Sequence, residues 1–145
     1  MSEKPSNKAE FEKILLKAGH SLTQPRKVIF GLLENADIPM GINEIIQESP
    51  TIDRATVYRT IELFEELKVF KRVWFGKSYK LELSESFQKH HHHLVCEICG
   101  EIQKIDSSSL ESLLGKLTKK MDYQPTDHHV ELFGKCPKHL ETSTD

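Results

Sequence analysis

The residues best suited to chemistry are cysteines and histidines, which are concentrated near the C-terminal end of the sequence. Cys96 and Cys99 are separated by two residues and followed by Gly100, a pattern that directs two thiolates toward one ion. A structural zinc ion takes four ligands, and Cys136 and His139 supply a second pair with the same spacing. We therefore predict a structural zinc site formed by these four residues, which adds folding free energy to a small core.

Four consecutive histidines precede this cysteine pair and lead directly into an apolar segment. Side chains of an extended segment alternate between two faces, so His91 and His93 form one pair and His90 and His92 form the other. One short strand can then serve two metal sites. The run is internal and short, which argues against an affinity tag.

Two carboxylates are candidate partners for these histidine pairs. Glu82 occupies the alternate face of an expected strand, so it is either an exposed strand residue or a partner of the His91 pair. Glu111 follows Ser108 by three residues, so it either completes a capping box or joins the His90 pair together with His128.

Helical spacing of apolar residues is present through much of the first half of the chain. It predicts one helix in AEFEKILLKAG that stops at Gly19, and a second in TQPRKVIFGLLENA that is capped by Thr23 and has a buried stripe. A third, shorter pattern covers residues 42–46, and Asp53 caps a fourth helix in RATVYRTIELFEEL. The expected buried stripe of the second helix is Val28, Ile29, Leu32 and Leu33, and that of the fourth is Val57, Ile61 and Phe64.

The fourth helix is either a solvated surface helix or a DNA recognition helix. Arg59 projects away from its core face, Tyr58 and Thr56 lie on the flanks, and Arg54 sits at the N-terminal end. Residues at the N-terminal end of a recognition helix reach base edges in the major groove, where arginine pairs with guanine. We interpret these four residues as candidate DNA contacts.

A β-hairpin is expected directly after this helix. VFKRVWF and YKLEL are β-type segments on either side of a turn around Gly76, and Lys77 lies in that turn. Short helices followed by a basic hairpin are typical of a winged helix, whose wing contacts phosphates. We therefore add Lys77 to the candidate DNA contacts. The basic side chains of the hairpin are Lys71, Arg72, Lys77 and Lys80.

Composition supports a two-part protein and excludes some classes. Residues 1–80 carry 13 Lys and Arg against 11 Asp and Glu, whereas residues 81–145 carry 7 against 11 and seven of the eight histidines. No apolar stretch approaches the ~20 residues of a membrane helix, and the polar N-terminus does not resemble a secretory signal. We expect a cytoplasmic protein in which an odd number of cysteines serves metal binding.

The order and spacing of LTQPRKVIFGLL, ATVYRTIELFEEL, HHHHLVCEICG and HHVELFGKCP resemble the ferric uptake regulator family over nearly the whole chain. The resemblance implies an α+β fold with a winged-helix DNA-binding domain at 1–83, a hinge at 84–89 and an α/β dimerisation domain at 90–145. It implies a homodimeric, metal-dependent repressor of palindromic operators that controls metal homeostasis or peroxide-stress genes. No enzymatic activity is expected.

Residue by residue, the resemblance assigns base contacts to Tyr58 and Arg59 and structural zinc binding to the three cysteines. It assigns the inter-domain regulatory site to Glu82, His91 and His93. It assigns a second site within the dimerisation part to His90, His92, Glu111 and His128, with His92 where the family often has aspartate.

This chain departs from the family pattern at three ligand positions. Pro39 and Met40 stand where many members have a histidine, Lys104 stands where they have a carboxylate, and His139 replaces a cysteine. The regulatory site is therefore reduced to three residues or completed by water or another side chain. Fe²⁺, Mn²⁺ and Zn²⁺ all suit such donors, and the lack of a further cysteine favours iron or peroxide sensing over zinc.

Two other functions compete with this prediction. A zinc-stabilised interaction module without DNA binding has the same cysteine pattern, and a metalloenzyme would use the histidines to activate water. The sequence has no HExxH motif, which disfavours the enzyme.

Overall fold

The computed structural model describes residues 6–106 and 108–142. It has the predicted α+β composition and consists of two compact units, unit 1 (Met1–Lys89) and unit 2 (His90–Asp145). The elements occur in the order α1 (Asn7–Lys17), α2 (Gln24–Asn35), α3 (Ile42–Glu48), α4 (Arg54–Glu66), β1 (Phe70–Phe75), β2 (Ser78–Leu83), β3 (His92–Cys96), β4 (Ile102–Ile105), α5 (Ser108–Lys120), β5 (Glu131–Gly134) and the 3-10 helix η1 (Pro137–Thr142).

Unit 1 begins with two helices whose caps differ from each other. The Ser6 hydroxyl accepts a hydrogen bond from the Ala9 amide at 3.3 Å and caps α1, which is followed by Gly19 with a φ of 79°. Thr23 occupies the N-cap position of α2, but its side chain makes no capping hydrogen bond, so the predicted side-chain cap is wrong. Pro25 in the first turn presets the helical φ there.

Aromatic side chains form the centre of the unit 1 core. Phe11 of α1 stacks on Phe30 of α2 with ring centroids 4.1 Å apart, and it meets Phe64 of α4 edge to face at 5.2 Å. Phe87 packs edge to face on Phe30, so the segment after β2 contributes to the same core. In α2 the buried residues are Ile29, Phe30 and Leu33. Val28 and Leu32, which were predicted to be buried, are only half-buried.

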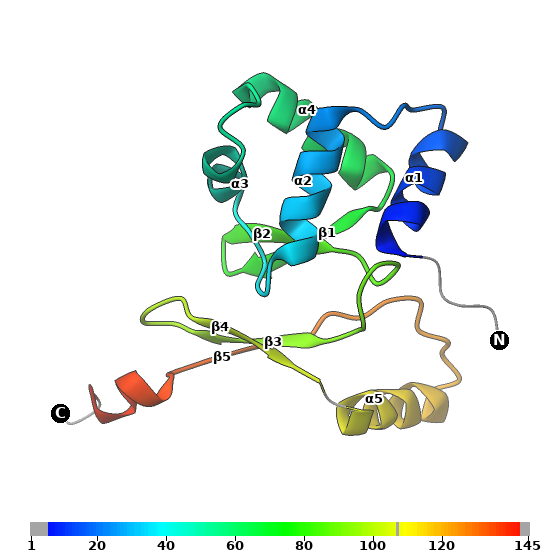
Figure 1. Ribbon diagram of the computed structural model, residues 1–145. Coiled ribbons are helices and arrows are strands. Elements are labelled where there is room, and N and C mark those ends of the chain that lie inside the picture. Colours follow the sequence, from blue (N-terminus) through cyan, green and yellow to red (C-terminus); the bar gives the residue numbers. More distant parts are fainter. Residues whose placement is uncertain (1–5, 107, 143–145) are drawn as a thin grey trace. The chain divides into compact units, whose positions relative to one another are not determined.

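The predicted helix–hairpin arrangement of a winged helix is present in unit 1. Asp53 caps α4, and Val57, Ile61 and Phe64 are buried as predicted. β1 and β2 pair antiparallel around a two-residue turn that contains Gly76, whose φ of 65° suits glycine. Figure 1 shows the four helices gathered on one side of this hairpin. Unit 1 therefore holds α4 rigidly and presents one side of it to solvent.

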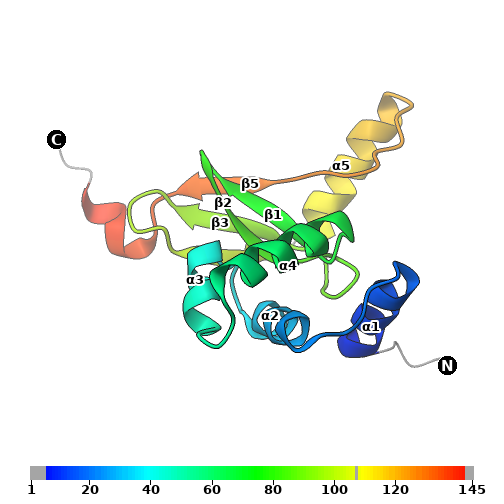
Figure 2. The same ribbon diagram turned by 90° about the horizontal axis from the view of Figure 1, so that it is seen from above.

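Unit 2 is built on a three-stranded sheet in the order β4-β3-β5. β3 pairs antiparallel with β4 and parallel with β5, so residues far apart in sequence become neighbours of the histidine run. α5 and η1 extend from opposite ends of this sheet (Figures 1 and 2). Neither the hinge at 84–89 nor the domain limits are tested by this division, and they remain predictions. No helix in the described part of the chain has the length and apolarity needed to cross a bilayer.

Candidate recognition helix and metal centres

The exposed side of α4 is organised by the cap at its first turn. Asp53 accepts hydrogen bonds from the Thr56 hydroxyl at 2.6 Å and from the Thr56 amide at 2.9 Å. These bonds, the hydroxyl one above all, lower the pKa of Asp53 below its usual 3.8. The Thr56 hydroxyl also accepts from Arg59 Nη2 at 3.1 Å, which orients the guanidinium. Thr56 therefore acts here as a link between the cap and Arg59.

Two further side chains, Tyr58 and Arg54, lie on this exposed side. Tyr58 is 40% exposed and Arg59 is exposed beside it. Arg54, in the first turn, donates to Asn43 Oδ1 of α3 at 3.5 Å. The structure thus brings the predicted DNA contacts of α4 onto one solvent-facing surface, while their role in binding remains a prediction.

The cations of the hairpin are largely compensated by carboxylates of unit 1. Arg72 pairs with Glu65 at 2.6 Å and lies over the Tyr79 ring, and Lys80 pairs with Glu44 at 3.3 Å. Lys77, in contrast, is exposed in the turn. The sequence predicted a basic hairpin, and the ion pairs leave Lys77 as the wing cation best placed to meet a phosphate.

In unit 2, Cys96, Cys99, Cys136 and His139 have ligand atoms that all lie within 4.8 Å of one another. Cys99 Sγ and Cys136 Sγ are 3.8 Å apart, and His139 Nδ1 lies 3.8 Å from Cys96 Sγ and 3.1 Å from Cys136 Sγ. Four ligands at Zn–S distances of ~2.3 Å in a tetrahedron lie about 3.8 Å apart. The donor set and its spacing therefore fit a zinc ion.

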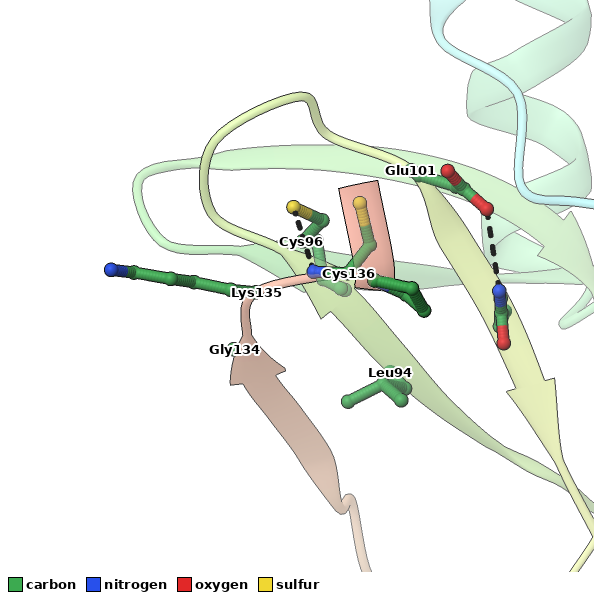
Figure 3. A pocket seen from close by; sticks show the side chains of 9 residues that line it. Leu94, Cys96, Glu101, Gly134, Lys135 and Cys136 are labelled. Carbon is green, nitrogen blue, oxygen red and sulfur yellow. Dashed lines mark hydrogen bonds between the residues drawn. The ribbon is translucent and has the colours of Figure 1, made fainter. Parts of the chain in front are cut away.

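The strand geometry explains why these residues meet. Cys96 ends β3, and its parallel partner in β5 is Gly134, two residues before Cys136. Figure 3 shows the Cys96 and Cys136 side chains next to each other, joined by a hydrogen bond of 3.3 Å from the Cys136 amide to the Cys96 sulfur. That bond, and a second from the Cys99 amide, lower the pKa of Cys96 to about 6. Burial raises the pKa of Cys136, so Cys96 is more readily available as a thiolate than Cys136 is.

The second predicted site is also assembled within unit 2. Glu111 Oε1 lies 3.2 Å from His90 Nε2, 2.6 Å from His92 Nε2 and 3.1 Å from His128 Nε2. The hydrogen bond from His92 is the largest cause of a Glu111 pKa lowered to about 2, and His128 adds to it. An ionised carboxylate facing three imidazoles is a donor set that suits a divalent cation.

This arrangement bears on one of the two interpretations of Glu111, the capping box. Ser108 lies inside α5 and is not its N-cap, and the residue before it lies outside the described part of the chain. The Glu111 carboxylate is directed to imidazoles, so the capping box proposed for Ser108 and Glu111 is not the arrangement seen. Glu111 instead connects α5 to β3 and to the segment before β5.

The residues of the predicted regulatory site belong to both units. In unit 2, the His91 and His93 rings lie 4.9 Å apart, as expected from alternation along an extended segment. In unit 1, Glu82 is buried on β2 and is not an exposed strand residue. Met40 pairs its backbone in both directions with Leu81, the residue before Glu82, at 2.7 and 2.8 Å.

A neighbour of Glu82 was missed at the level of sequence. Lys71 is the cross-strand partner of Glu82, and its Nζ lies 3.4 Å from Glu82 Oε1. The two-residue turn at Gly76 and Lys77 fixes the hairpin register, so counting outward from it reveals the pairing. The turn predicted from the sequence was therefore sufficient to predict this contact.

Comparisons with known proteins identify the family of this chain. The model of the ferric uptake regulator family matches residues 17–133. A ferric uptake regulation protein of Bacillus subtilis (strain 168) is 33% identical over 132 residues, covering 86% of this chain and 89% of the relative. One of Campylobacter jejuni is 32% identical, covering 87% and 83%.

Solved structures agree as well. The ferric uptake regulator of Vibrio cholerae superposes with a TM-score of 0.71 at 30% identity, covering 86% of this chain and 98% of the other. The regulator of Francisella tularensis, solved with iron, superposes with a TM-score of 0.72 at 27% identity, covering 85% and 96%. Both the family model and these relatives span most of the chain, and the protein therefore belongs to the ferric uptake regulator family.

Proposed function

We propose that this protein is a metal-responsive DNA-binding transcriptional regulator that represses its target genes as a homodimer. The observation that carries the proposal is the pairing, in one chain, of a capped helix with an exposed Tyr58 and Arg59 and a second unit that gathers metal ligands. Membership of the family supports the same assignment.

Unit 1 reads the DNA. Arg59 and Tyr58 of α4 enter the major groove, with Arg54 and Thr56 at the helix N-terminus, and Lys77 of the wing contacts a phosphate. The Asp53 cap and Thr56 hold the Arg59 guanidinium before binding, which reduces the conformational entropy lost on contact with a base.

Dimerisation is assigned to apolar surface of unit 2 that has no cover within the described chain. Leu113 and Leu117 lie on one side of α5 and are 52% and 49% exposed, and Met121, directly after the helix, is 71% exposed. Leu94 and Leu132 are cross-strand partners in the sheet and are 40% and 50% exposed. A second copy of this chain would cover such a surface, and the two-fold axis of a dimer matches a palindromic operator.

The proposed metal ligands have structural and regulatory tasks. Cys96, Cys99, Cys136 and His139 hold a structural zinc ion that fastens η1 to the sheet. Glu82, His91 and His93 form the regulatory site, and the His90, His92, Glu111 and His128 set forms the second site. Glu82, His91 and His93 would hold a divalent cation at this site, which would supply the regulatory signal. Glu82 and the two imidazoles suit Fe²⁺ or Mn²⁺, whereas the second site, with three imidazoles, suits Zn²⁺ better.

The DNA-binding part of this proposal is tested with Arg59→Ala. A duplex is selected by the wild-type protein from a random library, and its binding is followed by fluorescence anisotropy with Mn²⁺ present. Loss of a bidentate arginine–guanine contact weakens binding roughly 10- to 100-fold. Lys13→Ala is the matched control, because it removes one charge from an exposed position of α1 in the same unit. Unchanged affinity of Arg59→Ala, with the dimer and zinc intact, would support an interaction module instead of a DNA-binding regulator.

A further inference from the structure

Two lysines occupy cross-strand positions beside residues of the proposed regulatory site. In unit 1, Lys71 of β1 is directly opposite Glu82 of β2, with Nζ 3.4 Å from Glu82 Oε1. The same ammonium lies 3.9 Å from Glu85 Oε1. The Glu82 side chain is 6% exposed and that of Lys71 is 24% exposed, so this ion pair is shielded from much of the solvent.

The second lysine belongs to unit 2. Lys104 of β4 is the cross-strand partner of His93 of β3 in the antiparallel ladder. Directly opposite residues of such a ladder project from the same face, with Cβ atoms about 5 Å apart. Each unit thus contributes a lysine at the cross-strand position of one of its own proposed ligands, an ion pair in unit 1 and a register position in unit 2.

The two lysines affect cation affinity because the proposed ligand set carries little negative charge. Glu82 carries the set's only negative charge, because a metal-binding imidazole is neutral. The Lys71 ammonium already compensates that charge, so a divalent cation gains less attraction from Glu82 and is repelled by Lys71. Glu111 of the second site is different, since its carboxylate faces the imidazoles of His90, His92 and His128 and no lysine of the described chain.

We propose that Lys71 and Lys104 oppose cation binding at Glu82, His91 and His93 and so set a high cation threshold for the regulatory response. This inference rests on the proposed function, because it requires Glu82 to be a ligand of the regulatory cation. In the cation-free protein, Lys71 serves as an internal counter-ion that keeps the buried carboxylate compensated.

The test measures Mn²⁺ binding to the full-length, zinc-loaded dimer, with free Mn²⁺ quantified by electron paramagnetic resonance. The binding class of interest is the one that Glu82→Gln removes. Lys71→Met and Lys104→Met are each expected to tighten that class about tenfold, the effect of removing one unit charge about 6 Å from a divalent ion in a water-like dielectric. Lys80→Met is the matched control, because Lys80 lies in the same hairpin but pairs with Glu44.

A charge-conserving variant separates an electrostatic effect from a structural one. Lys71→Arg keeps the positive charge opposite Glu82 and is expected to bind Mn²⁺ as weakly as the wild type. Wild-type affinity in both Lys71→Met and Lys104→Met, with binding still lost in Glu82→Gln, would overturn the inference and leave the proposed regulatory site intact. Unchanged Mn²⁺ binding in Glu82→Gln would remove Glu82 from the site and overturn both.

Discussion

The two units differ in what stabilises them. Unit 1 has fifteen apolar side chains in one buried cluster, centred on Phe11, Phe30 and Phe64. In the described part of unit 2, the buried apolar side chains are Val95, Cys96 and Ile102, and α5 buries none of its residues. Hydrophobic burial stabilises a domain in proportion to the apolar area removed from water, so unit 1 is expected to fold without help and unit 2 is not.

Unit 1 is stabilised by an apolar core, whereas unit 2 has two sets of proposed polar metal ligands. One set ties the C-terminal η1 to β3, and the other ties α5 to β3 and His128 through Glu111. Small domains with few buried apolar groups commonly depend on metal ions or a second subunit for stability. We therefore expect unit 2 to be less stable than unit 1 without cations and more sensitive to them, which is the property a metal sensor requires.

Loss of the zinc site is expected to have the largest effect on this contrast. Cys96→Ser removes one of four ligands, so the protein should lose its tightly held zinc and unit 2 should lose its ordered structure. Metal analysis gives the zinc content, and hydrogen exchange by mass spectrometry reports on each unit separately. Peptides of unit 2 should exchange rapidly while those of unit 1 stay protected. His129→Asn, next to a proposed ligand but outside both ligand sets, is the control. Full protection of zinc-free unit 2 from exchange would show that unit 2 does not need zinc for its stability.

A cavity in the other unit should have the reverse effect. Phe64 is fully buried and packs on Phe11, so Phe64→Ala is expected to cost unit 1 about 3–5 kcal/mol of unfolding free energy. Urea titration followed by the fluorescence of Trp74, a residue of β1, measures this loss. The zinc content should not change. Leu16→Ala is a suitable control, since Leu16 is 62% exposed on α1; equal destabilisation by both variants would contradict the core assigned to unit 1.

The apolar side of α5 tests whether a second subunit stabilises unit 2 in addition to metal ions. Leu117→Lys introduces a charge into the proposed dimer surface and should weaken self-association on the order of 100-fold. Sedimentation equilibrium measures this, with Lys116→Ala, a neighbouring exposed position on the same helix, as control. A dimer of unchanged affinity would place the subunit contact elsewhere.

The smallest expected effect concerns the cap of α4. Asp53→Ala removes the acceptor of two hydrogen bonds and should lower the melting temperature of unit 1 less than Phe64→Ala does. Because the folded-state pKa of Asp53 is lowered, its stabilisation is complete above about pH 4 and is lost as the pH falls through the folded pKa. Melting curves of both proteins should therefore converge in acid, and a constant difference down to pH 2 would show that the carboxylate charge contributes nothing.

Local patterns in the sequence were sufficient to predict most of unit 1. The helical spacing of Val57, Ile61 and Phe64, the cap at Asp53 and the turn at Gly76 all depend on neighbours within a few residues. The family resemblance supplied the order of the two parts. Thr23 shows the limit of this reasoning, because a good capping residue occupied the cap position without making the hydrogen bond.

Long-range pairing limited the prediction of unit 2. Alternation along an extended segment correctly separated His91 and His93 from His90 and His92. The approach of Cys136 to Cys96, however, depends on parallel pairing of β3 with β5 across 35 residues of sequence, and no local pattern predicts that pairing. The ion pairs of the wing were missed for a similar reason, since their carboxylates lie on other elements.

The most direct test of the account is DNA binding by the zinc-loaded dimer as a function of an added regulatory cation. Fluorescence anisotropy with the selected duplex is measured with Fe²⁺ under anaerobic conditions, with Mn²⁺, and after treatment with a chelator that leaves the structural zinc in place. We predict that the added cation tightens binding on the order of 100-fold, and that Glu82→Gln abolishes the difference. Equal affinity with and without the added cation would contradict it.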